Sequence, residues 1–313
     1  MKRRQFIKTS SASVLAIPGA VQTGLAETKD LLPKRPLGET GENLSIIGFG
    51  GIIVSRVEQD HANTVVAQAM EKGINYFDVA PSYGDAEDHL GPALEPFRKD
   101  VFLACKTAKR DTAGAEEEFH TSLKKLRTDH FDLYQLHALS KMDDLEMAMA
   151  PGGAMEFIQK AKEKGLVRYL GFSAHSAEVA LAAMEQFDFD TILFPFNYVT
   201  WHEGQFGPQV MAKAKEKGVA RLALKGLAKT TRKAGDEPDP YKKCWYVPIT
   251  DAEEGDLALR FTLSLDITAA VTPGEEVFLH RAVEIAQRYQ PLTEAEQAKV
   301  EDLAKGVVPI FTA

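Results

Sequence analysis

Three short apolar runs in this sequence each end in an ionisable residue, and these residues suit acid–base chemistry. Asp78 ends the run Asn-Tyr-Phe-Asp, Lys106 ends Leu-Ala-Cys-Lys, and His137 ends Leu-Tyr-Gln-Leu-His, at intervals of 28 and 31 residues. Tyr83 follows Asp78 by five residues. Because each interval fits one strand and one helix, successive parallel strands would bring these side chains to one rim of a barrel.

The four residue types fit the interconversion of a carbonyl and an alcohol. Reduction needs an acid that protonates the oxygen as hydride arrives, and oxidation needs the same group as a base. A free tyrosine, with a pKa of about 10, does this poorly at neutral pH, but a neighbouring ammonium lowers that pKa and a carboxylate holds the ammonium in place. His137 would hydrogen-bond the substrate oxygen. Each residue alone also fits an ordinary role as a strand end, turn cap, packed aromatic or core histidine, so their joint placement favours the site.

The elements that would position these residues alternate along the chain. Short apolar runs typical of buried parallel strands are separated by amphipathic stretches of helical periodicity. The expected strands are 44–49, 74–77, 101–105, 131–136, 167–172, 191–194, 219–224 and 267–271, and the clearest helices are 60–72, 115–126, 154–164 and 209–217. Eight such units predict an α/β fold, a closed (β/α)8 TIM barrel. An open dinucleotide-binding sheet is disfavoured, because the glycines at 48, 50 and 51 lack the spacing of its phosphate-binding turn.

The barrel is expected to fill one domain, residues 33–313. Its lead-in, 33–44, is interpreted as a hairpin closing the barrel bottom, and glycines at 73, 165 and 218 should end helices because they tolerate a left-handed backbone. The stretch 229–251, rich in charge, proline and aromatic residues, is interpreted as an irregular lid or substrate loop.

Composition narrows the class of partner. The chain has 313 residues, 44% of them hydrophobic and 26% charged, and a formal net charge of -8. Its acidic and basic residues are scattered, which argues against nucleic acid and for a small-molecule substrate. The eight histidines are dispersed, so we expect no metal site. Cys105 and Cys244 are expected to be buried free thiols, although one disulfide remains an alternative.

The first 26 residues resemble an export signal. A basic start is followed by a mildly apolar stretch and by small residues before Ala26. Arg3 and Arg4, with Phe6 and Lys8 behind them, resemble a twin-arginine signal. Cleavage after Ala26 removes four basic residues and no acidic ones, leaving 33 basic against 45 acidic residues. We therefore expect the twin-arginine export machinery to deliver the folded protein to the periplasm, with no stable membrane anchor after processing.

Beyond these features the sequence resembles the aldo-keto reductase family. The stretch 73–84, Gly-Ile-Asn-Tyr-Phe-Asp-Val-Ala-Pro-Ser-Tyr-Gly, is similar to the family's motif at its second strand. Lys106 in Phe-Leu-Ala-Cys-Lys-Thr and His137 in Asp-Leu-Tyr-Gln-Leu-His match the two other catalytic positions. The resemblance covers essentially the whole chain after the signal. It implies NAD(P)-dependent hydride transfer on a small polar molecule, a sugar among the candidates, with Tyr83 as general acid/base tuned by Lys106 and Asp78.

The resemblance also assigns cofactor-binding residues, at positions where the pattern departs from the family. These candidates are Gly50, Ser173, Asn197, Leu224, Lys225, Gly274 and Arg281. Ser173 is followed by alanine instead of asparagine, and Lys225 follows Leu224 where an aromatic residue often stacks on nicotinamide. Glu275 and Glu276 stand where a basic residue usually meets the adenosine phosphate, and they would repel a 2′-phosphate unless Arg281 compensates. Family habit implies NADP, with NAD as the alternative.

Other readings of the same residues stay open. A permanently bound cofactor, oxidising and re-reducing one hydroxyl, would make the chain an epimerase or eliminase. The altered cofactor positions would also suit a non-catalytic barrel that acts as a binding protein. Four aromatic residues in expected rim loops are candidates for stacking on a sugar: Trp201, His202, Trp245 and Tyr246. Substrate identity and oligomeric state are not determined by the sequence.

Overall fold

Eight parallel strands close into a barrel in the computed structural model, which describes residues 31–233 and 240–313. Around the barrel the strands follow the order β12-β3-β4-β5-β6-β7-β8-β9. They are β3 (Ile47–Gly50), β4 (Tyr76–Asp78), β5 (Phe102–Thr107), β6 (Phe131–Leu139), β7 (Val167–Ala174), β8 (Thr191–Pro195), β9 (Ala220–Leu224) and β12 (Ala269–Val271). The predicted (β/α)8 TIM barrel is confirmed. The expected export signal lies outside the described residues.

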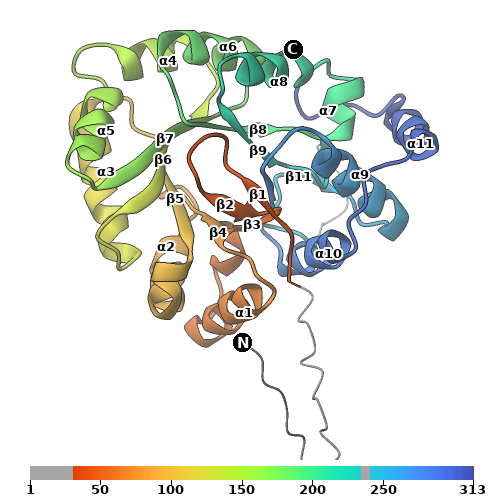
Figure 1. Cartoon of the computed structure of the whole chain (residues 1–313), viewed down its shortest axis with the longest axis horizontal. Helices are drawn as coiled ribbons and strands as arrows, with labels where there is room; N and C mark the ends of the chain where they lie inside the picture. The colour runs from red at the N-terminus through yellow and green to blue at the C-terminus, as the bar shows by residue number, and fades with distance from the viewer. Residues whose placement is uncertain (1–30, 234–239) are drawn as a thin grey trace, which may run out of the picture.

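Helices surround the barrel on all sides (Figure 1). They are α1 (Gln59–Glu71), α2 (Ala86–Leu94), α3 (Thr112–Lys125), α4 (Met142–Met149), α5 (Ala154–Glu163), α6 (Ala177–Gln186), α7 (Tyr198–His202), α8 (Pro208–Glu216), α9 (Ala252–Ser264), α10 (Glu276–Gln287) and α11 (Glu294–Ala304), with 3-10 turns η1 (Gly51–Val54) and η2 (Glu95–Asp100). The four helices predicted from periodicity are present. Gly73, Gly165 and Gly218 follow three of them with φ of 86°, 74° and 71°, the left-handed conformation that was expected.

The apolar residues form an outer and an inner core. The outer core lies between the sheet and the helices, and Phe119 of α3 packs edge-on against Phe131 and Tyr134 of β6 there. The inner core fills the barrel itself, with Tyr76, Phe102 and Leu133 among its members. The barrel interior is therefore packed solid, so chemistry is confined to its ends.

A hairpin closes the bottom of the barrel, as the sequence predicted. β1 (Lys34–Pro36) pairs antiparallel with β2 (Asn43–Ser45), and Leu37 and Leu44 are buried in the inner core. The predicted strand 44–49 is consequently wrong in its bounds, because it is divided between β2 and β3. Figure 1 shows this hairpin lying across the near end of the barrel.

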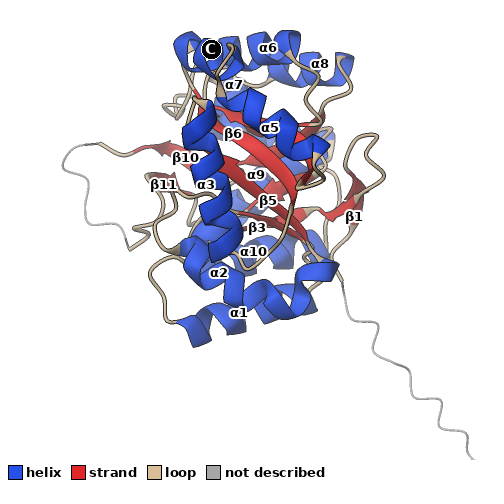
Figure 2. Ribbon diagram, turned by 90° about the vertical axis from the view of Figure 1, so that its left-hand side faces the viewer, coloured by secondary structure: helices blue, strands red, loops and turns tan. Residues whose placement is uncertain are grey.

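A second hairpin lies at the opposite end. β10 (Ala228–Thr231) pairs antiparallel with β11 (Tyr246–Pro248), and Figure 2 shows β10 and β11 on one side of the barrel and β1 on the other. The expectation that 229–251 is wholly irregular is therefore wrong, since its two ends pair as strands. Both strands stand next to the carboxyl ends of the barrel strands, where barrel active sites are built.

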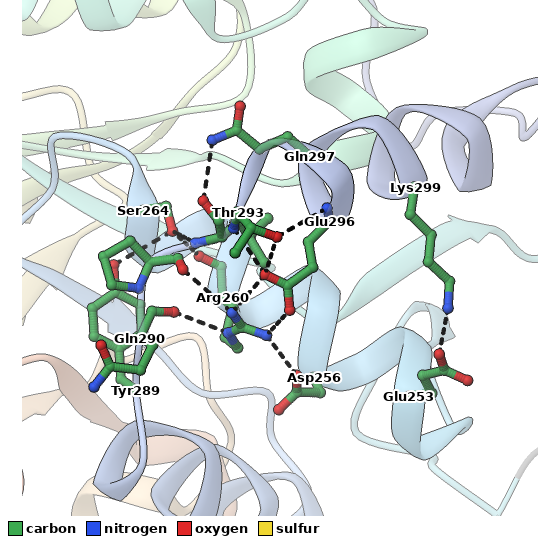
Figure 3. Close-up of polar contacts among 12 residues, drawn as sticks. Glu253, Asp256, Arg260, Ser264, Tyr289, Gln290, Thr293, Glu296, Gln297 and Lys299 are labelled. Atoms are coloured by element: carbon green, nitrogen blue, oxygen red, sulfur yellow. Dashed lines mark hydrogen bonds and ion pairs between the residues drawn. The ribbon is translucent and has the colours of Figure 1, made fainter.

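Ion pairs and hydrogen bonds tie the last helix, α11, to α9 (Figure 3). Arg260 of α9 makes a two-pronged contact with Glu296, at 2.6 and 3.0 Å, and a 3.3 Å contact with Asp256. Thr293 and Glu296 form a capping box at the start of α11. The chain after α11 then returns to the barrel, and Phe311 stacks on His175 beyond β7 with ring centres 4.9 Å apart.

Two further sequence expectations are addressed by the fold. Cys105 and Cys244 are both buried and free, as expected, which leaves no disulfide between them. Within the described part of the chain, none of the helices combines the length and apolar character that crossing a bilayer requires.

Candidate active site

A buried ion pair links the ends of two neighbouring barrel strands. The ammonium of Lys106 on β5 lies 2.5 Å from Asp78 Oδ1 on β4 and donates a second hydrogen bond to the carbonyl oxygen of Val79, at 3.1 Å. The two side chains are only 1% and 2% exposed. The other carboxylate oxygen of Asp78 accepts hydrogen bonds from the Tyr76 hydroxyl, at 3.2 Å, and the Gln135 amide, at 3.4 Å. Such a pair is held in one geometry because every alternative leaves a charge buried without a partner.

Tyr83 and His137 lie directly above this pair. The ammonium of Lys106 is 5.3 Å from the centre of the Tyr83 ring, and the rings of Tyr83 and His137 meet edge to face with centres 5.8 Å apart. Both Tyr83 and His137 are half-buried, whereas Asp78 and Lys106 are buried. The structure therefore brings together all four residues that strand ends alone had suggested, with the two half-buried ones on the exposed side.

Burial and charge act against each other on these groups. Burial raises the pKa of Tyr83 above its ordinary value of 10.0, and the nearby Lys106 charge only partly opposes this. The sequence argument, that the ammonium lowers the tyrosine pKa, accounts for the second effect but omits the larger first one. Burial alone would lower the pKa of Lys106, yet the charge of Asp78 leaves it above 10.5. The phenol thus keeps its proton at neutral pH, as a proton donor must.

Positively charged side chains lie near His137. Burial lowers its pKa well below 6.5, and Lys106, His175, Lys225 and Arg110 lower it further. The imidazole is therefore neutral at neutral pH, so it can donate a hydrogen bond to a substrate oxygen but does not carry a charge. Its Nδ1 lies 3.4 Å from the hydroxyl of Ser82.

The backbone after His137 is held in an unusual shape by side chains from two neighbouring loops and strands. Ala138 has φ of 53°, a conformation rare for residues other than glycine. Its N–H donates to Ser173 Oγ on β7, at 2.8 Å, and Arg110 donates to the carbonyl oxygen of His137, at 2.7 Å. Because Ser173 Oγ accepts this bond, its own hydroxyl hydrogen can still be donated to another acceptor.

Lys225, a second candidate cofactor residue, faces the same mouth. It follows β9 with φ of 63°, and its ammonium lies 3.2 Å from Nε2 of His175. The rings of Trp245 and Phe311, whose centres are 5.8 Å apart, lie together on one side of this ammonium, with centres 5.5 and 5.6 Å from it. Leu224, just before it, packs half-buried against the inner core. The aromatic position of the family is thus occupied here by a cation next to two aromatic rings.

Asn197 and Gly50 have structural partners that use their polar groups. The Asn197 side chain accepts from Thr200 N, at 2.9 Å, which caps α7, and donates to the carbonyl oxygen of Lys225, at 3.2 Å. Gly50 ends β3 and donates to Thr272 Oγ1, at 3.1 Å, and a Cβ at Gly50 would lie 2.4 Å from Thr272 O. Asn197 and Gly50 therefore help to fix the backbone at the mouth, through their hydrogen bonds with Lys225, Thr200 and Thr272.

The turn before α10 is the place that the resemblance assigns to the adenosine phosphate. A Cβ on Gly274 would lie 2.5 Å from Ile52 of η1, so only glycine allows this close approach. Glu275 accepts from Lys243 N, at 2.8 Å, while the Lys243 ammonium donates to the carbonyl oxygen of Ile53, at 2.7 Å. Arg281 is directed away from the two glutamates, toward the carbonyl oxygens of residues 249, 250 and 251.

Two of the four aromatic candidates lie elsewhere. Trp201 and His202 belong to α7 and pack against Phe261 of α9, with ring centres 6.0 and 5.4 Å apart, so their interpretation as sugar-stacking rim residues is wrong. Trp245 and Tyr246 do lie at the mouth, the first 53% exposed and the second buried. Trp201 was expected in a rim loop, but the short helix α7 follows β8 directly and carries this residue instead.

Sequence reasoning missed two mouth residues. Arg110 comes shortly after the end of β5, and its position after a strand could have identified it as a candidate site residue. No feature of the sequence pointed to Phe311, because its position depends on how α11 packs against α9. Within the described ranges, no group of three or more histidine, cysteine or carboxylate side chains is arranged to hold a metal ion.

The comparisons with known proteins agree with this geometry. The model of the aldo/keto reductase family matches residues 46–246, and the chain therefore belongs to this family. It is 30% identical over 178 residues to an uncharacterized oxidoreductase, YqkF, of Bacillus subtilis, and 26% identical over 214 residues to the L-galactose dehydrogenase of Arabidopsis thaliana. These matches cover 52% and 62% of this chain and only 56% and 65% of the two relatives.

A solved structure shows the same fold. The holo form of aldo-keto reductase AKR11C1 from Bacillus halodurans superimposes with a TM-score of 0.69, over 89% of this chain and 98% of that one, at 24% sequence identity. At this identity the likeness establishes the barrel architecture, and the chemistry has to be argued from the residues themselves.

The neutral state of His137 can be tested directly. We expect the NMR resonance of its imidazole Cε1–H, assigned by its loss in His137→Gln, to stay constant as the pH falls past 6.5, since burial and nearby cations disfavour the imidazolium. A midpoint at or above 6.5 would contradict the electrostatic account of the mouth.

Proposed function

We propose that this chain is an NAD(P)-dependent oxidoreductase that interconverts a carbonyl and an alcohol on a small polar molecule, with Tyr83 as the general acid/base. The observation that carries the proposal is the placement of Tyr83 and His137, half-buried and in contact, above the buried Asp78–Lys106 pair. Oxidoreductases recur among the relatives, which supports the class of reaction.

The residues of the site divide the work between positioning and proton transfer. A bound nicotinamide cofactor supplies or accepts the hydride. His137 donates a hydrogen bond to the carbonyl oxygen and holds it next to the Tyr83 hydroxyl. Tyr83 gives its proton to that oxygen during reduction and takes it back during oxidation. Lys106 favours the phenolate that remains, and Asp78 keeps the Lys106 ammonium charged and fixed.

Replacement of Tyr83 by phenylalanine tests this assignment. The Tyr83→Phe variant should lose about 10²- to 10⁴-fold in turnover of a simple aldehyde, the usual contribution of a positioned acid, while cofactor affinity stays close to that of the wild type. Steady-state assays of NAD(P)H consumption measure the first and fluorescence titration the second.

Tyr134 offers a matched control, because this buried tyrosine belongs to the outer core, away from the mouth. Tyr134→Phe should turn over at nearly the wild-type rate. Retained turnover in Tyr83→Phe would remove the proposed mechanism, and a well-folded wild type that binds neither cofactor would leave the non-catalytic barrel as the better description.

The turn before α10 favours NAD(H) over NADP(H), in contrast to the family habit. Glu275 is the N-cap of α10, and the carboxylate of Glu276 lies 2.7 Å from His61 Nε2 and 3.3 Å from His280 Nε2. Arg281 already donates to backbone carbonyls. A 2′-phosphate would therefore meet two carboxylates, whereas the ribose hydroxyls of NAD could donate to them.

Titrations with each cofactor distinguish a preference for NAD(H) from a preference for NADP(H). We expect NADH to bind at least about tenfold more tightly than NADPH, a difference of about 1.4 kcal/mol that one poorly screened like-charge contact can supply. Joint replacement Glu275→Gln and Glu276→Gln should narrow the difference, and Glu294→Gln at the start of α11 should not. Tighter binding of NADPH to the wild type would favour the original expectation of NADP. Turnover by dialysed protein without added cofactor would instead favour the epimerase or eliminase.

We also propose export by the twin-arginine machinery to the periplasm, supported by Arg3, Arg4, Phe6 and Lys8. Residues 1–40 fused to a reporter that folds before export should carry it across the inner membrane. Joint replacement Arg3→Lys and Arg4→Lys should abolish this transport, because the machinery reads the arginine pair. Equal transport with both changes would exclude this route.

A further inference from the structure

Among the described residues, Lys225 at the mouth of the barrel has no carboxylate partner, and we propose that its ammonium binds a carboxylate group on the substrate. The substrate class would then be a carbonyl compound that also carries a carboxylate. This inference rests on the proposed function, since it names the substrate of the same site. It is carried by the contacts of Lys225 and by the charges of the described residues around it.

Lys225 is fixed in place by contacts at both ends of the residue. Its carbonyl oxygen accepts from the Asn197 amide, at 3.2 Å, and from Ala228 N, at 2.9 Å. Its ammonium lies 3.2 Å from Nε2 of His175, and the ring centres of Trp245 and Phe311, which contact each other, are 5.5 and 5.6 Å away. The side chain is half-buried, so it is held firmly yet can be reached from the mouth.

The charges around Lys225 leave its ammonium without compensation. Among the described residues, no aspartate or glutamate forms an ion pair with it, whereas Lys229, four residues on, pairs with Glu254 at 2.8 Å. Lys106 is already neutralised by Asp78. Burial, together with the Lys106 charge, lowers the pKa of Lys225 to about 7. A partly buried ammonium that lacks an acid is costly to keep, and an anion would relieve that cost.

The donors available fit a carboxylate. One ammonium hydrogen is directed at His175, whose pKa burial and Lys225 lower to about 3, so His175 is neutral and accepts this bond. Two hydrogens remain for two oxygens. The guanidinium of Arg110 adds positive charge nearby; it donates to the carbonyl oxygens of Thr107 and His137, and its buried Nε–H has no partner among the described residues. The Lys225 ammonium itself carries one positive charge, which matches the single negative charge of a carboxylate.

The carboxylate would lie close to the reacting group. Lys225 and His175 are near enough to lower the pKa of His137, which meets Tyr83 edge to face. A molecule whose carbonyl oxygen lies at Tyr83 and His137 can thus extend its other end toward Lys225, next to the rings of Trp245 and Phe311, which contact each other.

The test compares two aldehydes that differ in charge but share a ring: 4-carboxybenzaldehyde and its methyl ester, methyl 4-formylbenzoate. The wild type should prefer the acid in kcat/KM. Lys225→Met should lower the ratio of acid to ester by about tenfold or more, the usual effect of removing one partner of a close charge pair. Lys225→Arg should keep most of the preference, because it keeps the charge. Lys229→Met, which removes an already paired lysine from the same rim, should leave the ratio unchanged.

A binding experiment separates this proposal from the proposed reaction. Benzoate, titrated into cofactor-free protein, should change the fluorescence of Trp245, which lies against Lys225, and benzamide should not. The benzoate signal should vanish in Lys225→Met and persist in Tyr83→Phe. If the wild type binds benzoate through Lys225 but reduces neither aldehyde, the result contradicts the proposed reaction and supports the anion-binding site at Lys225.

Several results would overturn the proposal. One is an unchanged acid-to-ester ratio in Lys225→Met, verified as folded by circular dichroism. Another is an equal fall of the acid-to-ester ratio in Lys229→Met, which would show that the preference arises from the overall positive charge at the mouth and not from Lys225 itself. A third is a loss of NAD(P)H affinity in Lys225→Met without a change in the ratio, which would place the ammonium on the cofactor. Preference for glucose 6-phosphate over both glucuronate and glucose would replace the carboxylate by a phosphate.

Discussion

The buried pair of Asp78 and Lys106 is the constraint on which the rest of the site depends. Each charge would be too costly to bury alone, and together they accept a single arrangement in which Tyr76, Gln135 and the backbone of Val79 supply the remaining hydrogen bonds. The barrel meets this requirement by placing the carboxyl ends of two adjacent strands, β4 and β5, side by side. Once the pair is fixed, the positions of a tyrosine in the next loop and a histidine on the next strand determine where a carbonyl can react.

The sequence was informative where chemistry coincides with regular structure. Asp78, Lys106 and His137 lie among the last three residues of consecutive strands, β4, β5 and β6. Their spacing follows from one strand and one helix per unit, so the barrel and the meeting of these side chains were both predictable. Gly73, Gly165 and Gly218 were predictable for a related reason, since each needs a backbone shape that other residues resist.

The sequence was uninformative where position depends on packing between distant segments. Phe311 reaches His175 only because Arg260 and Glu296 hold α11 against α9, and no local pattern encodes that docking. Trp201 was misplaced because an immediate helix turns it outward, toward Phe261. The direction of the Tyr83 pKa was also misjudged, because the sequence reveals a neighbouring charge more readily than the depth of burial that outweighs it.

The closure of the barrel has a consequence for how the protein is made. β12, formed by residues 269–271, pairs with β3, residues 47–50, so the first and last strands of the barrel are neighbours. The tail that brings Phe311 to the mouth follows later still. During synthesis the growing chain therefore carries an open sheet edge until β12 has left the ribosome, and the segment that carries Phe311 reaches the mouth after that. Any molecule that must be enclosed by this mouth can be taken up only once both segments have been made.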